Sequence, residues 1–134
     1  MPDIDVVDST WLNAPLATVA AIVAEPSNWR RWWPDLAVEI HEWRGEKGVR
    51  WTVRSPADRA DGTMEIWLEP SCGGVVLHYF LRLDAENGHR ISARRARRAV
   101  DARRKATKLI FWALGDQLDP GRTTRVAAAH GTAR

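Results

Sequence analysis

The last third of the chain constrains the fold most, because residues 92–118 have the pattern of one long amphipathic helix. Ser92 is a suitable N-cap, and Asp119-Pro120-Gly121 would end the helix after Leu118. The expected inner face carries small residues in the first half and larger ones in the second: Ala96, Ala99, Val100, Ala102, Ala106, Leu109, Ile110, Ala113, Leu114 and Leu118. A helix of 27 residues spans about 40 Å, whereas a five-stranded sheet is only about 20 to 25 Å wide. The first turns of the helix are therefore expected to overhang the layer that grips it.

These first turns are strongly basic. Between Arg90 and Lys108 the sequence has nine basic residues and one acidic residue, Asp101, which gives a local charge of +8. The whole chain has a formal charge of +3, so the remainder carries −5. Cations near the N-terminus of a helix oppose the helix dipole, and such local conflicts are typical of functional or partner-contacting surfaces. A solvated face and a surface for an anionic partner both remain open at this point.

Upstream, the sequence predicts a strand over Ile4–Leu12 and two short helices over Leu16–Ala24 and Asn28–Trp33. Pro26 would stop the first helix, and Ser27 would cap the second. The second helix places three indoles on one face at i, i+3, i+4 spacing: Trp29, Trp32 and Trp33. This large apolar surface either packs as a lid on the core or lines a ligand cavity, and the two roles overlap.

Four further strands are expected over Ala37–Trp43, Val49–Arg54, Thr63–Glu69 and Val75–Leu83. Their short connections predict an antiparallel meander. Alternation directs Trp51, Met64, Ile66, Leu77 and Tyr79 inward, whereas a reversed register would direct Trp67, His78 and Phe80 inward. The fold class is therefore α+β: a curved antiparallel sheet of five or more strands wrapped on a long C-terminal helix, with two short helices after the first strand.

This order of elements resembles the START-like (SRPBCC) superfamily, the helix-grip fold of Bet v 1-type proteins and of the polyketide cyclase/dehydrase group. The resemblance rests on Asn13-Ala14-Pro15, on residues 25–34 (EPSNWRRWWP), on Gly48-Val49-Arg50-Trp51 and on residues 62–67 (GTMEIW). The chain is particularly similar to small, uncharacterised actinobacterial members. Residues 1–118 then form a single domain of this type, and 119–134 a disordered tail.

The expected strand count departs from the family pattern, which usually has seven strands. Either a further strand lies within 56–61, or the sheet is truncated and its cavity more open. A cavity opened in this way would favour dimerisation, so a homodimer is among the expected partners.

The resemblance implies a cavity between the sheet and the C-terminal helix that takes up an apolar or aromatic small molecule or lipid, for transport or sequestration. The eight tryptophans and the alanine-rich helix face agree with that expectation, since ligand sites are mostly apolar. We expect nine residues to line it: Trp29, Trp33, Trp51, Met64, Ile66, Leu77, Tyr79, Ala99 and Arg103. Arg103 falls on the inner arc of the helix, which is costly unless it meets a carboxylate, a ligand or solvent.

Two alternative functions are open. The first is a cyclase/dehydrase-type enzyme, which needs an acid or base near a carbonyl; the candidates are Glu65, His78, Tyr79 and Arg82, and none of them can be assigned as catalytic. The second is an interaction protein that uses the basic helix face. Aromatic residues are not interleaved with the arginines and no recognition motif is present, which argues against nucleic acid.

The remaining motifs indicate no metal, no cofactor and a cytoplasmic chain. The sequence has no catalytic triad, no metal-ligand spacing and no phosphate loop. No apolar run approaches the roughly 20 residues of a membrane span, and residues 1–5 lack the features of a signal peptide. The single cysteine, Cys72, excludes an internal disulfide.

Overall fold

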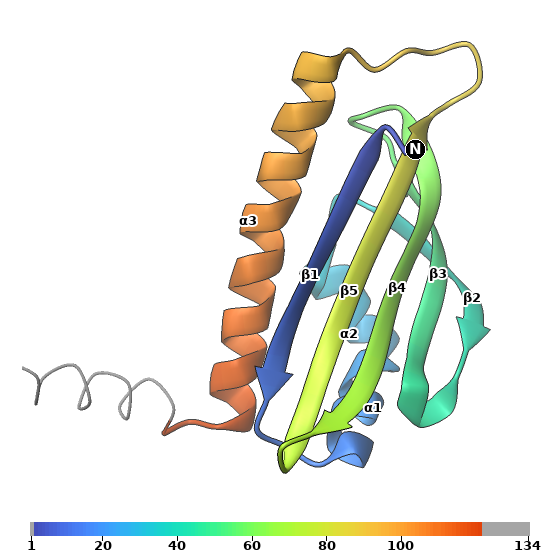
Figure 1. The fold of residues 1–134 in the computed structure, drawn as a ribbon. Helices are drawn as coiled ribbons and strands as arrows, with labels where there is room; N and C mark the ends of the chain where they lie inside the picture. Colours follow the sequence, from blue (N-terminus) through green and yellow to red (C-terminus); the bar gives the residue numbers. More distant parts are fainter. Residues whose placement is uncertain (1, 122–134) are drawn as a thin grey trace, which may run out of the picture.

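A computed structural model describes residues 2–121. It contains nine elements: β1 Ile4–Leu12, α1 Leu16–Val23, α2 Pro26–Trp32, β2 Ala37–Trp43, the 3₁₀ turn η1 Gly45–Lys47, β3 Gly48–Ser55, β4 Ala60–Ser71, β5 Gly74–Ala85 and α3 Ala93–Leu118. The five strands form one antiparallel sheet in the order β1-β5-β4-β3-β2. Figure 1 shows α3 alongside β1, with α1 and α2 on the face of the sheet turned away from the viewer. This arrangement confirms the α+β helix-grip architecture.

The first two strands have the predicted bounds, whereas β3, β4 and β5 are longer than predicted, and the number of strands is the smaller of the two options. Residues 56–59 form a hairpin turn, and β4 begins at Ala60, which pairs with both Ser55 and Ala85. Within residues 2–121 the sheet therefore has five strands and no additional strand in 56–61. The expected tail lies outside the described residues from 122 onward.

The strand facings follow the predicted alternation. The five side chains directed inward, Trp51, Met64, Ile66, Leu77 and Tyr79, are all buried. Of the residues on the opposite face, Trp67 is 37% exposed, and His78 and Phe80 are half-buried. Because side chains alternate along a strand, only two sets of residues can face the core, and the set with more apolar residues does so here.

The helix α3 runs along β1 rather than across the sheet, and its first turns extend beyond the end of β1 (Figure 1). Its buried residues are Thr107, Phe111, Leu114 and Gly115. The sequence placed Leu109 on the inner face, but this side chain is 73% exposed, so that assignment was wrong. The alanines at 102, 106 and 113 are also exposed. Because alanines are tolerated on either face of a helix, they had biased the predicted face toward the wrong side.

The helix ends are capped in part as predicted. The Ser92 hydroxyl accepts a hydrogen bond from the Arg95 N–H at 3.2 Å, which confirms that N-cap. The cap assigned to Ser27 was wrong, because α2 begins earlier, with Pro26 in its first turn. The Glu25 carboxylate is the cap instead and accepts from the Ser27 N–H at 3.2 Å. Proline fits this position because the first helical N–H needs no partner.

Candidate ligand site

A chain of aromatic rings fills the space between the sheet and α3. Trp51 on β3 contacts Trp33 and Trp29, with ring centroids 5.2 and 5.3 Å apart. Trp33 also stacks on Tyr79 of β5 at 6.1 Å, and Tyr79 meets Phe111 of α3 edge to face at 6.3 Å. All five side chains are buried. The tryptophan-bearing segment around α2 is therefore joined to the sheet and to α3 by continuous ring contacts.

A narrow crevice lies beside this cluster. It is lined by residues of the α2 segment, the inner sheet face and α3: Trp32, Trp33, Ile66, Leu77, Tyr79, Thr107, Ile110, Phe111 and Leu114. Its volume is only about 10 Å³, which is the space of a single water molecule. Trp32 and Ile110 are half-buried and form its rim. This crevice is thus closed by its own side chains in this conformation.

Two polar groups in this interior are poorly satisfied. The Tyr79 hydroxyl donates to the Met64 sulfur at 3.2 Å, and a thioether is a weak acceptor. The Trp51 indole N–H is buried and has no partner among the described residues. Burial raises the pKa of the Tyr79 phenol, an effect that nearby Arg103 partly offsets. Tyr79 is therefore a neutral hydrogen-bond donor at physiological pH.

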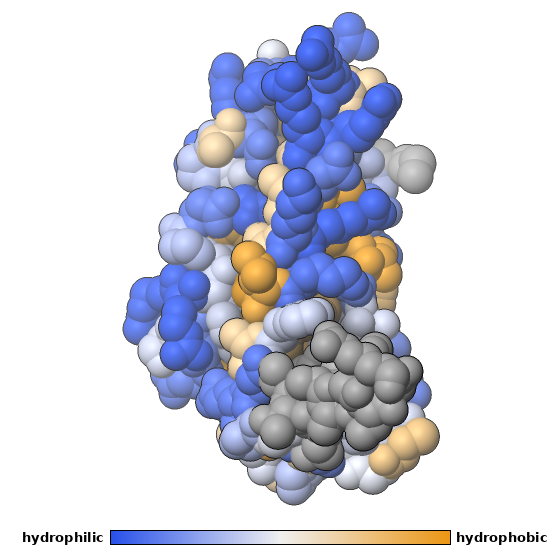
Figure 2. All heavy atoms as spheres, turned by 90° about the vertical axis from the view of Figure 1, so that its left-hand side faces the viewer, coloured by the Kyte–Doolittle hydropathy of each residue, from blue (hydrophilic) through white to orange (hydrophobic). Residues whose placement is uncertain are grey.

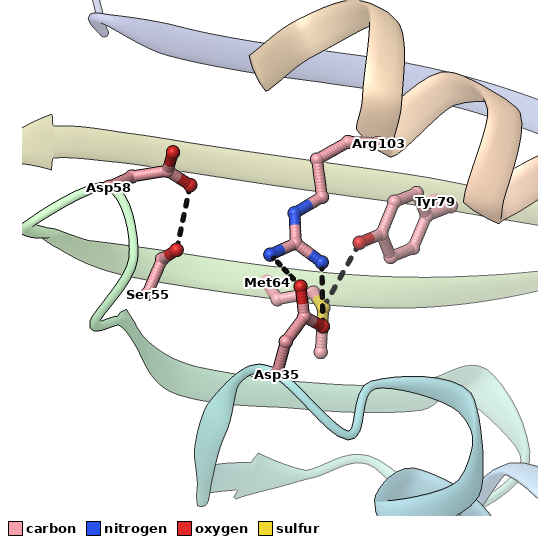
Figure 3. Close-up of polar contacts among 6 residues, drawn as sticks. All are labelled: Asp35, Ser55, Asp58, Met64, Tyr79 and Arg103. Carbon is pink, nitrogen blue, oxygen red and sulfur yellow. Dashed lines mark hydrogen bonds and ion pairs between the residues drawn. The ribbon is translucent and has the colours of Figure 1, made fainter.

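An ion pair lies beside Tyr79. Arg103 of α3 donates two hydrogen bonds to the Asp35 carboxylate, at 2.7 and 3.1 Å. Figure 3 shows the side chains of Arg103, Asp35, Tyr79 and Met64 converging from four parts of the chain. Burial raises the pKa of Asp35, but the hydrogen bond and charge of Arg103 outweigh it, so the pKa of this carboxyl lies below its usual value.

The Arg103–Asp35 pair supplies the carboxylate that an arginine on the inner arc of the helix was expected to need. The Arg103 side chain is 11% exposed, and its charge on the inner arc of α3 is balanced by a carboxylate. Asp35 lies in the segment between α2 and β2, so the pair also ties the segment after α2 to α3.

Of the nine predicted lining residues, four line this crevice: Trp33, Ile66, Leu77 and Tyr79. Trp29, Trp51 and Met64 are buried in the adjoining core. Arg103 contacts Asp35. Ala99 is half-buried one helical turn before Arg103 and packs at the margin of the core.

The sequence did not identify Asp35, Thr107 or Phe111 as site residues. For Asp35 a signal was present: an arginine on the inner arc requires a carboxylate, and Asp35 directly follows the tryptophan-rich segment. Thr107 and Phe111 were missed because of the error in the predicted helix face.

Of the four candidate catalytic residues, only Tyr79 faces the interior. Glu65 bonds Arg44 at 2.6 Å and His78 lies 3.3 Å from Glu69, both on the outer sheet face. Glu65 and Arg82 line an open, polar depression of about 310 Å³ there, together with Arg44, Arg50, Thr63, Trp67 and Phe80. These outer residues cannot act on a molecule held beside Tyr79.

Two features are absent between residues 2 and 121. No group of three or more histidine, cysteine, aspartate or glutamate side chains is arranged to hold a metal ion there. No helix in this range combines the length and apolar character that a membrane crossing requires.

Comparison with known proteins gives a likeness in fold only. No family model matches the chain, and no curated protein matches it. Among solved structures, the di-domain ARO/CYC StfQ from the steffimycin biosynthetic pathway superposes with a TM-score of 0.63 at 12% identity, over 90% of this chain and 52% of that one. Protein CV1439 from Chromobacterium violaceum gives 0.62 at 13%, over 87% and 99%. The Aha1 dimer from Colwellia psychrerythraea gives 0.59 at 13%, over 88% and 98%. At these identities the superpositions show a shared fold and no shared activity.

Proposed function

We propose that this protein binds a small apolar or aromatic molecule between the inner face of its sheet and α3, in order to sequester or transport it. The observation that carries the proposal is the pair of poorly satisfied donors, the Tyr79 hydroxyl and the Trp51 indole N–H, inside an aromatic core. An unpaired buried donor costs roughly 1–3 kcal/mol. A flat apolar ligand with one or two acceptor atoms would remove that cost and replace the ring contacts that are broken when the ligand enters.

Binding requires the crevice to open, because the space now present holds only about one water. The part to move is the α2 segment, which supplies Trp32 and Trp33 to the crevice. This helix has seven residues and contains one buried side chain, Trp29. The Arg103–Asp35 pair tethers the chain just after it. We therefore propose that a ligand enters between Trp32 and Ile110 while this tether holds the far side.

The fold comparison supports this proposal at a coarse level. One similar structure, StfQ, is an ARO/CYC protein of a biosynthetic pathway, and DynU16, from the dynemicin biosynthetic locus, superposes with a TM-score of 0.61 at 10% identity. The fold is thus present in proteins of biosynthetic pathways, which produce small organic molecules.

The test is binding of a naphthalene-type fluorescent probe, followed by tryptophan quenching and by native mass spectrometry. Wild type should bind one probe per chain. Ile110→Trp should fill the rim of the crevice and weaken binding by at least about tenfold, as expected when a buried contact surface of one ring is lost. Leu109→Trp is the matched control: it adds the same ring one residue away, on a side chain that is 73% exposed, and should bind as wild type does.

Near-ultraviolet circular dichroism shows whether Ile110→Trp is folded. If it is not, Ile110→Phe replaces it. Absence of a one-to-one complex in wild type, or equal weakening in the two tryptophan variants, would exclude the crevice as the binding site.

A cyclase- or dehydrase-type enzyme is the second candidate, and the side chains around Tyr79 favour it. Tyr79 is a protonated donor, and the guanidinium of Arg103 lies close enough to influence its pKa. Together they could hydrogen-bond and polarise a substrate carbonyl. In that case Tyr79→Phe should abolish turnover of a poly-β-ketone substrate while changing its affinity by less than about tenfold, the worth of one hydrogen bond. Unchanged turnover in Tyr79→Phe would exclude this role.

A further inference from the structure

The exposed surface of α3 carries charge that the fold does not use. Of the nine basic residues between Arg90 and Lys108, Arg103 pairs with Asp35 and Lys108 pairs with Asp8. The other seven are exposed and form no ion pair with any residue in 2–121: Arg90, Arg94, Arg95, Arg97, Arg98, Arg104 and Lys105. Figure 2 shows strongly hydrophilic residues over the upper part of this face of the molecule. The charge is concentrated on one element and is left open to solvent.

Apolar side chains continue the same surface toward the C-terminal end of α3. Arg94, Arg98, Lys105, Leu109 and Trp112 follow one another at intervals of four, seven, four and three residues, so they form one line along the outer side of the helix. Leu109 is 73% and Trp112 64% exposed. Figure 2 shows apolar patches at mid-height, on either side of the hydrophilic residues that run down the middle of this face. The outer line of α3 is therefore basic first and apolar afterwards.

We propose that this outer line docks the protein on the surface of an anionic lipid bilayer. The exposed guanidinium groups would meet the lipid phosphates, and Trp112 and Leu109 would enter the interface, where indoles and apolar side chains are favoured. The face lies on a helix that is already formed and capped, so docking needs no folding step. This proposal is independent of the ligand site, which lies on the opposite side of α3.

A bilayer fits this surface better than a nucleic acid does. Binding of single strands relies on aromatic rings placed among the cations, so that bases stack while phosphates pair. Here the aromatic residue of the line, Trp112, lies beyond its last cation, Lys105, which is seven residues or about 10 Å away along the helix. Leu109, the most exposed large apolar residue, offers no ring for stacking.

The test is co-sedimentation with vesicles of phosphatidylcholine alone and of phosphatidylcholine mixed with phosphatidylglycerol. Wild type should bind the mixed vesicles at low salt, release them at high salt and ignore the neutral ones. Arg94→Glu with Arg98→Glu should weaken binding by at least about tenfold, since each basic residue near an anionic surface contributes roughly a fivefold gain.

The matched control is Arg30→Glu with Arg31→Glu, which makes the same change in net charge at two exposed arginines of α2. It should stay within about threefold of wild type, because these residues lie away from the docking line. Leu109→Ala with Trp112→Ala should reduce binding several-fold and make the remainder more sensitive to salt. Urea unfolding of each variant identifies any loss of binding that is due to unfolding.

Three results would overturn the proposal. The first is equal binding to neutral and mixed vesicles, or equal loss in the Arg94/Arg98 and Arg30/Arg31 variants. The second is binding of an oligonucleotide that depends on Arg94 and Arg98, without vesicle binding. The third is a wild-type homodimer, detected by sedimentation velocity, that does not bind vesicles and that dissociates in the Leu109→Ala, Trp112→Ala variant. Ile110→Trp should bind vesicles as wild type does, which separates this test from that of the crevice.

Discussion

The two halves of α3 differ in how they are held. In the C-terminal half, Thr107, Phe111, Leu114 and Gly115 are buried, and Phe111 joins the aromatic cluster through Tyr79. In residues 93–106 no side chain is buried. The polar contacts of this N-terminal half are one cap at Ser92 and one ion pair at Arg103, and Ala99 and Val100 pack only at the margin of the core. Packing free energy is therefore concentrated in the second half of a helix that is continuous in hydrogen bonding.

This difference shows how one helix can serve two surfaces. The C-terminal half completes the core, so its residues are determined by packing. The N-terminal half adds little buried area, so its residues are free to satisfy other demands, such as a dense positive charge. Local opening should be easier there than in the core, because few apolar contacts must be broken.

The largest expected effect is on the anchored half. Phe111→Ala removes a ring that is 5% exposed and contacts Tyr79, and should lower the free energy of unfolding by about 3–5 kcal/mol, since a large core side chain is replaced by a cavity. Urea denaturation measures it. Trp112→Ala, next along the chain and 64% exposed, is the control and should change stability by less than about 0.5 kcal/mol. Similar values for the two variants would contradict the division between the halves.

A smaller, pH-dependent effect is expected at the ion pair. Arg103 holds the pKa of Asp35 below its usual value, so the folded state has the lower pKa. The stability contributed by the pair is then complete above the unfolded pKa of about 3.9 and is lost as the pH falls through the folded pKa. Since Asp35 is 58% exposed, Asp35→Asn should cost only about 1 kcal/mol above pH ~5. The deficit should shrink below pH ~4.

Urea denaturation at a series of pH values measures that deficit. Asp101→Asn is the control, because Asp101 is an exposed aspartate of α3 that forms no ion pair with residues 2–121. It should follow wild type at every pH. A deficit in Asp35→Asn that stayed constant or grew toward low pH would show that Arg103 does not stabilise the Asp35 carboxylate.

The parts of this structure that could be predicted from the sequence are the strands, in which side chains alternate between the two faces of the sheet. Alternation on β3, β4 and β5 placed Trp51, Met64 and Tyr79 correctly, because a strand has only two faces. The helix face was predicted less well. Exposed alanines at 102, 106 and 113 resemble an inner face in a hydrophobicity pattern, and this rotated the predicted face toward Leu109.

The interior of the site could not be predicted in the same way. Asp35 lies in a connection without a repeating pattern, and its partner is 68 residues away. Whether Trp33 fills the crevice or leaves it open depends on side-chain packing from α2, three strands and α3 together. The composition could supply the aromatic residues but not the volume left between them.

The smallest expected effect is at the first turn of α3, where the weakly held half begins. Arg95 is the third residue of this helix, and its N–H donates to the Ser92 hydroxyl. Arg95→Glu would remove a cation from the positive end of the dipole and complete a capping box with Ser92, which should stabilise the first turns by about 0.3–1 kcal/mol. Amide hydrogen exchange over residues 95–100 should slow about two- to fivefold, while exchange in the C-terminal half stays unchanged, because the two halves open separately. Arg95→Gln separates the capping hydrogen bond from the charge and should give a smaller gain. Faster exchange in Arg95→Glu would instead show that Arg95 holds the N-terminal half in place.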